Sequence, residues 1–175
     1  MTKIEEILQS KIKPKEKQVN LVQKVISEQI SVGELIQFFK SAHGAQKGTC
    51  ADVMKHISKE KPEMLEPYIQ LLIHYIIDDL PRVKWGVSET IGNLAGKYPE
   101  KVTDAIPYLM KNTTDEKTNT TVIKWCAAFG LTEIAKNHPK TREQLLPEFE
   151  KIINREKNNG VKNVYLKALK KINES

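Results

Sequence analysis

The sequence predicts an all-α protein built as a stack of about five antiparallel helix pairs. Apolar residues recur at helical spacing along most of the chain. A repeat of about 35 to 40 residues runs through its middle, a period typical of stacked helix pairs. Only 6% of the 175 residues are aromatic and 39% are hydrophobic, which suits one helical core. We therefore expect a single domain over residues 1–175.

The N-terminal part is expected to supply two helix pairs. Apolar spacing places their helices near residues 2–11, 15–29, 32–42 and 47–60. Gly33 and Gly44 mark turns between them. The unit over residues 1–30 follows the pattern least closely.

Residues 62–98 form the clearest helix pair of the sequence. Over 62–79, apolar residues recur at helical spacing behind Pro62, which fits a first helical turn. A second apolar stripe over 83–98 stops before Pro99, and Leu80-Pro81 separates the two helices. Later helices are expected near residues 99–113, 118–137, 141–156 and 160–173.

The repeat is visible in identical residues at one offset. Lys84-Trp85 and Lys124-Trp125 lie 40 residues apart. The same offset relates Pro99 to Pro139, and it also relates Ala95 to Ala135 and Pro107 to Pro147. The register continues across the polar breaks of the chain, so no linker between domains is expected.

These repeated residues resemble the HEAT repeat. The pattern consists of Asp79, Val83-Lys84, Ile91, Leu94-Ala95, Pro99 and Pro107-Tyr108-Leu109, and it returns as Asp115, Ile123-Lys124, Ile134-Ala135, Pro139 and Pro147. The resemblance is fullest over 62–157 and extends over 32–61 and 158–173. It departs from the usual pattern in having Lys at 84, 124 and 162, where the family often has Arg. It implies a right-handed α-solenoid whose second helices line a concave face.

Four lysines recur near the start of the second helix of a pair: Lys47, Lys84, Lys124 and Lys162. One interpretation is a line of cations that grips phosphates or acidic side chains of a partner. The other, which we favour, is a ladder in which each lysine meets a turn aspartate such as Asp79 or Asp115. Such a ladder would connect neighbouring repeats.

Trp85 and Trp125 are the only tryptophans, and each follows a lysine of this series. Exposed on a concave face, they would anchor a peptide or a base. Packed between repeats, they would be core residues. Glu89 shares the helix face of Trp85, four residues further on.

A tryptophan, basic residues and a carboxylate on one face suggest an enzymatic alternative. The chain is similar in fold and in its basic pI to the HEAT-like alkylpurine DNA glycosylases, with Trp85 to Glu89 as the matching step. No second motif identifies a catalytic carboxylate.

The remaining residues give little support to other chemistry. Cys50, Cys126 and four scattered histidines show no metal-ligand or nucleophile spacing, so neither a metal nor another cofactor is expected. No apolar run is long enough for a membrane span, and the two distant cysteines favour a reducing, cytoplasmic location. The basic excess lies in residues 1–30 and 140–175. The basic helix expected at 160–173 would either cap the array or dock on an acidic surface.

We expect a noncatalytic scaffold that binds a protein or peptide partner on the concave face. Its contact centre is predicted at Lys84, Trp85, Lys124 and Trp125, beside Glu89. Nucleic-acid binding is the alternative, because clustered lysines favour phosphates. The sequence does not name the partner or an oligomeric state.

Overall fold

The computed structural model describes residues 1–114 and 116–175, and helices are the only regular elements in these two ranges. The all-α prediction is confirmed. The first two pairs are α1 (Lys3–Gln9) with α2 (Pro14–Ile26), and α3 (Val32–Ser41) with α4 (Gly44–Glu60). These bounds lie within three residues of those that the apolar spacing predicts.

The remaining elements complete three further pairs within the described ranges. The third pair consists of η1 (Pro62–Tyr68), α5 (Ile69–His74) and η2 (Tyr75–Ile77), followed by α6 (Pro81–Leu94). The fourth consists of α7 (Pro99–Val102), η3 (Thr103–Ala105) and α8 (Ile106–Lys111), followed by α9 (Thr121–Asn137). The fifth joins α10 (Pro139–Arg155) to α11 (Asn159–Asn173).

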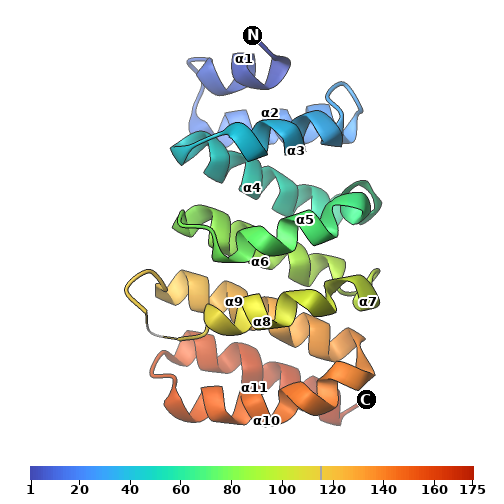
Figure 1. Cartoon of the computed structure of the whole chain (residues 1–175), viewed down its shortest axis with the longest axis vertical. Coiled ribbons are helices and arrows are strands. Elements are labelled where there is room, and N and C mark those ends of the chain that lie inside the picture. Colours follow the sequence, from blue (N-terminus) through green and yellow to red (C-terminus); the bar gives the residue numbers. More distant parts are fainter. Residues whose placement is uncertain (115) are drawn as a thin grey trace.

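The pairs follow one another along the long axis of the molecule, and the two termini lie at opposite ends (Figure 1). The second helices α2, α4, α6, α9 and α11 pack side by side in chain order, and we call them the second-helix layer. The first helices of the pairs cover one side of this layer (Figure 1). Each pair therefore has its main contacts with the pairs before and after it.

Two elements differ from the sequence prediction. Residues 62–79 and 99–113 were each expected to form one helix, but both are divided into short α and 3-10 segments. Pro67 lies inside η1 and Pro107 in the first turn of α8, where neither can donate the backbone hydrogen bond of a continuous helix. Pro147, in contrast, is accommodated within α10.

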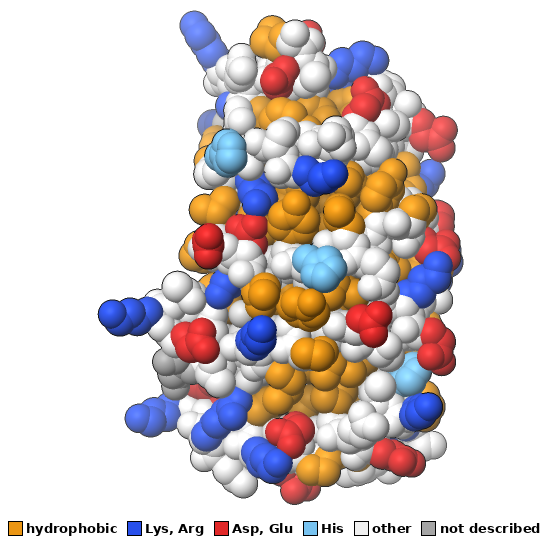
Figure 2. Space-filling model, viewed as in Figure 1, with side chains coloured by type: hydrophobic (Ala, Val, Ile, Leu, Met, Phe, Trp, Pro, Cys, Tyr) orange, Lys and Arg blue, Asp and Glu red, His pale blue; other side chains and the backbone are white. Residues whose placement is uncertain are grey.

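The hydrophobic core lies between the two layers and runs the length of the stack. Leu35, Ile57, Leu72, Val87 and Phe149 are fully buried in it. Further apolar side chains form bands across the face of the first helices (Figure 2). None of the helices in the described ranges is long and apolar enough to cross a membrane.

Close approach of α4 and α6 depends on a glycine. A Cβ built at Gly86 would lie 3.1 Å from Ala51 Cβ and 3.2 Å from the Ala51 carbonyl carbon. Backbone cannot move aside as a flexible side chain can. The absence of a side chain at position 86 therefore sets how closely these two helices pack.

Candidate functional site

Three of the repeated lysines form a ladder between neighbouring pairs. Lys47 Nζ in α4 lies 2.7 Å from Asp78 Oδ2, in the loop before α6. Lys84 Nζ in α6 donates to Asn119 Oδ1 at 3.0 Å and to Thr118 Oγ1 at 3.3 Å, in the loop before α9. Each lysine thus reaches the loop that begins the next second helix.

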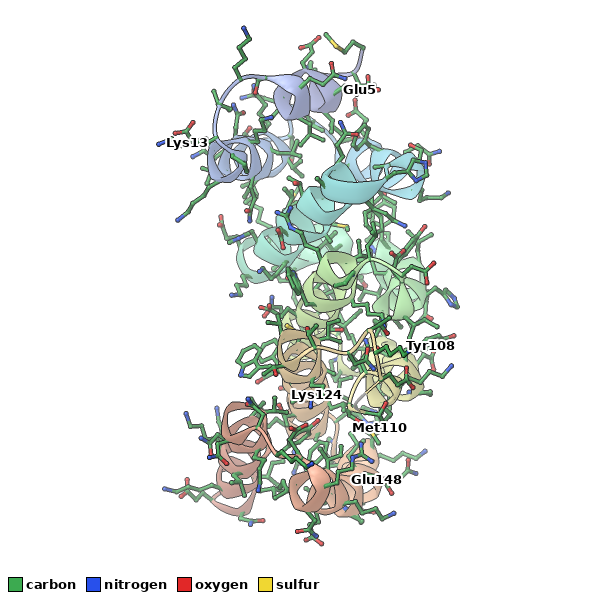
Figure 3. All side chains as sticks on the ribbon, turned by 90° about the vertical axis from the view of Figure 1, so that its left-hand side faces the viewer. Glu5, Lys13, Tyr108, Met110, Lys124 and Glu148 are labelled. Atoms are coloured by element: carbon green, nitrogen blue, oxygen red, sulfur yellow. The ribbon has the colours of Figure 1, made fainter. Side chains whose placement is uncertain are left out.

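The third rung continues the same geometry. Lys124 Nζ in α9 lies 3.0 Å from Glu156 Oε2, in the loop before α11. Lys124 projects from α9 toward the last helix pair (Figure 3). The Glu156 carboxylate also accepts a hydrogen bond from the Asn158 backbone N–H at 2.8 Å. The Glu156 carboxylate therefore binds both the Lys124 amine and the backbone just before α11.

The partners of the ladder differ from those predicted. Asp79 is exposed and is the partner of none of these three lysines, so the expectation that it belongs to the ladder is wrong. Its neighbour Asp78 is the residue that pairs, with Lys47 of the preceding repeat. Asp115 lies outside the described residues.

The burial of two of these lysines does not fit the alternative interpretation of an exposed line of cations. Lys84 is 7% exposed and Lys124 is 6% exposed. Charged groups at this depth require hydrogen-bonded partners, which the loops supply. The ladder is the arrangement that the contacts of Lys47, Lys84 and Lys124 support.

Glu89 lies in a cluster of charged side chains on α4 and α6. Arg82 Nη2 lies 2.6 Å from Asp52 Oδ2, and Lys55 Nζ lies 3.9 Å from Asp52 and 3.8 Å from Glu89. The Cys126 thiol of α9 donates to Glu89 Oε1 at 3.4 Å. Burial, together with this carboxylate, raises the pKa of Cys126 well above its ordinary value. The Glu89 carboxylate is therefore held by groups from α4 and α9.

The two tryptophans differ in environment although they occupy equivalent repeat positions. Trp85 is half-buried on α6, whereas Trp125 is 40% exposed on α9. The indole of Trp125 stacks on Phe129 with ring centroids 5.9 Å apart and planes 3° from parallel. Phe129 in turn lies against Gly92 of α6, where a Cβ would come within 2.6 Å of its ring. The ring on which Trp125 stacks is therefore itself packed against the neighbouring helix α6.

A groove of about 290 Å³ runs beside this aromatic pair, between α9 and α11. We call it the α9–α11 groove. Its α9 wall consists of Trp125, Phe129, Thr132, Glu133 and Lys136. Its α11 wall consists of Gly160, Asn163, Val164, Lys167, Ala168 and Lys171. Gly160, which has no side chain, and Ala168, which has only a methyl group, leave the space open opposite the larger side chains of α9.

The groove continues into a polar hollow of about 220 Å³ at the C-terminal ends of α9 and α11. Glu133, Lys136 and Lys171 line both the groove and the hollow, whereas Arg142 lines the hollow but not the groove. Arg142 donates to the carbonyl oxygens of Ala135 and Lys136, each at 2.7 Å. One end of the combined groove is therefore aromatic and the other is basic.

The predicted site residues therefore divide into two groups. The structure places Lys84, Lys124 and Glu89 in contacts between repeats, and it places Trp125 at the groove, with Trp85 half-buried on the neighbouring helix. Phe129 was not among the predicted site residues. Its spacing of four residues from Trp125, which puts both rings on one helix face, is the signal that could have found it.

The described residues include no group of three or more His, Cys, Asp or Glu side chains placed to hold a metal ion. Comparison with protein-family models finds no match to this chain, and comparison with curated proteins finds none either.

Proposed function

We propose that this chain is a right-handed HEAT-like α-solenoid that serves as a noncatalytic scaffold for a protein partner. The partner would contact the second-helix layer, with its centre at the α9–α11 groove. The observation that carries the proposal is the exposed indole of Trp125, stacked on Phe129 at the edge of that groove. The repeated Lys-Trp pairs and the order of the helices support the solenoid.

An aromatic side chain at a groove suits protein recognition. Trp provides a large contact area and loses little conformational entropy when a partner covers it. Tryptophans are frequent among the few interface residues that account for most of the binding energy. The packing of Phe129 against Gly92 restrains the Phe129 ring, on which Trp125 stacks, in the free protein. The two stacked rings therefore form a preorganised apolar surface on which an apolar side chain of a partner can pack.

The candidate catalytic groups support a noncatalytic role. Glu89 is engaged by Lys55 and by the Cys126 thiol. Burial raises the pKa of the other thiol, Cys50, to about 12, so it stays protonated near neutral pH. Neither cysteine has the features of an activated nucleophile.

Nucleic-acid binding is the second candidate, because Lys167 and Lys171 stand in the same groove as a stacked aromatic pair. Bases stack on such rings, and lysines attract phosphates. Binding of this kind would weaken steeply as salt increases. The basic excess is local, however, and the charges of residues 31–139 balance.

Selection from a library of random displayed peptides, with the folded protein as bait, tests the scaffold proposal. We expect enriched peptides whose affinity falls at least about tenfold in the variant Trp125→Ala/Phe129→Ala, a loss of about 1.4 kcal/mol or more. The matched control is Ile12→Ala/Val19→Ala, which removes two exposed apolar side chains from the first pair. Peptides that bind both variants as tightly as the parent would contradict the proposal, provided circular dichroism shows both to be folded.

A further inference from the structure

The basic end of the α9–α11 groove has more positive charge than the residues around it neutralise. Lys167 and Lys171 are exposed, and neither forms an ion pair with another residue of the described ranges. Among the described residues that line the groove, Glu133 is the one Asp or Glu, and it pairs with Lys136 on its own helix. The guanidinium of Arg142 is held on backbone carbonyls. Positive potential therefore remains at this end.

Some exposed lysines elsewhere on the stack are paired with carboxylates of a neighbouring repeat. Lys97 pairs with Glu63 at 2.9 Å, and Lys101 pairs with Glu66 at 2.8 Å, each across neighbouring repeats. In these pairs, a carboxylate of the same protein neutralises the charge of the lysine. Lys167 and Lys171 instead direct two such charges into an open groove whose other end is apolar.

The length of the groove sets the spacing of groups that could fill it. Trp125 and Lys136 are 11 residues apart on one helix, which separates them by roughly 16 Å at 1.5 Å per residue. An extended peptide covers that distance in about five residues. A ligand with an apolar side chain at Trp125 would therefore place residues up to about five positions away beside the lysines.

We propose that the α9–α11 groove binds an acidic peptide segment of a partner protein. One large apolar side chain of the segment packs on Trp125 and Phe129, and Asp or Glu residues within about five positions, on one side of that anchor, face Lys167 and Lys171. Charge complementarity selects this occupant, because carboxylates pair with the lysines while the anchor fills the apolar end. The inference rests on the proposed scaffold function and adds the chemistry of the partner.

The peptides enriched from the random library provide the test. We expect them to share an aromatic or large aliphatic residue with several Asp or Glu residues on one side of it. Lys167→Glu/Lys171→Glu is expected to weaken the binding of a fluorescein-labelled enriched peptide at least about tenfold, and Lys167→Gln/Lys171→Gln to weaken it less. Binding is also expected to weaken as NaCl increases, because these charges are solvent-accessible. The matched control, Lys40→Glu/Lys140→Glu, reverses two exposed lysines on first helices and is expected to leave the affinity unchanged.

The outcomes separate the two proposals. Uncharged enriched peptides that require Trp125 but tolerate Lys167→Glu/Lys171→Glu would overturn the acidic partner and leave the scaffold function standing. If no enriched peptide requires Trp125, both proposals fail. A labelled DNA oligonucleotide that binds through Lys167 and Lys171, with no acidic peptide enriched, would overturn the acidic partner in favour of nucleic acid.

Discussion

At the scale of single residues, the Lys124–Glu156 pair shows how charge is used inside the stack. Their side chains are 7% and 4% exposed, and the two charged groups lie 3.0 Å apart. Water has little access to either charged group at this depth. The pair therefore ties α9 to the loop before α11 and makes the last repeat depend on the one before it.

Removing the amine of Lys124 is expected to be costly. Lys124→Met leaves a buried carboxylate without this partner and should lower the free energy of unfolding by about 3 kcal/mol. Urea denaturation followed by circular dichroism measures the change. Lys151 is the matched control, because it is 68% exposed and pairs with Glu148 on its own helix. Lys151→Met should change stability by less than about 1 kcal/mol, and equal effects of the two substitutions would contradict the ladder.

The two cysteines give a second prediction at this scale. Both are buried, and burial raises the pKa of Cys50 to about 12 and shifts the pKa of Cys126 in the same direction. Since the thiolate is the reactive form, we expect both to react slowly with Ellman's reagent at pH 8 in the folded protein. Both should react rapidly in urea. Fast reaction of either thiol without denaturant would show that its helix does not pack as described.

Residue roles in the candidate site could be predicted only in part. The repeat register identified the ladder lysines, because it depends on the local sequence. Their partners could not be identified, since Glu156 lies 32 residues beyond Lys124 in the loop of the following repeat. The exposure of Trp125 depends in the same way on a neighbouring helix, which presents Gly160 and Ala168 to the groove.

At the scale of elements, packing between second helices relies on positions without side chains. Gly86 of α6 lies against the backbone of Ala51 in α4, and Gly92 lies against the ring of Phe129 in α9. Glycines of α6 thus allow this helix to pack closely against both α4 and α9. The helix bounds themselves could be predicted from apolar spacing and from prolines, which act locally. The 3-10 segments around Pro67 and before Pro107 could not, because packing decides whether a proline is accommodated.

A methyl group at position 86 tests this fit. Gly86→Ala is expected to lower the free energy of unfolding by about 1 to 3 kcal/mol, even though Ala favours helix, because the added carbon would press on backbone. Gly96→Ala is the control, since a Cβ there would meet its nearest neighbour, Asn137 Oδ1, at 3.9 Å. Thermal unfolding of both variants makes the comparison. A stabilised Gly86→Ala protein would show that α4 and α6 pack less closely.

At the scale of the whole molecule, each pair is held mainly by its neighbours in the stack. The central second helices α6 and α9 pack against a second helix on both sides. In repeat arrays, such as the proposed solenoid, stability is shared between units and their interfaces. Loss of one interface should therefore affect adjacent pairs first.

Hydrogen exchange should reveal this gradient. We expect the slowest-exchanging amides in α6 and α9, and faster exchange in α1, which has neighbours on one side only within the described ranges. Mass spectrometry of peptides from the exchanged protein measures it. Uniform protection from α1 to α11 would indicate a single cooperative unit and contradict a stack of separable pairs.

The most direct test of the central claim is acrylamide quenching of Trp125 with and without a peptide selected on the folded protein. In Trp85→Phe the fluorescence comes from Trp125, and in Trp125→Phe it comes from Trp85. We predict strong quenching of Trp125 in the free protein and protection when the peptide is bound, with little change at Trp85. Binding that leaves the quenching of Trp125 unchanged would show that the partner site lies elsewhere on the stack.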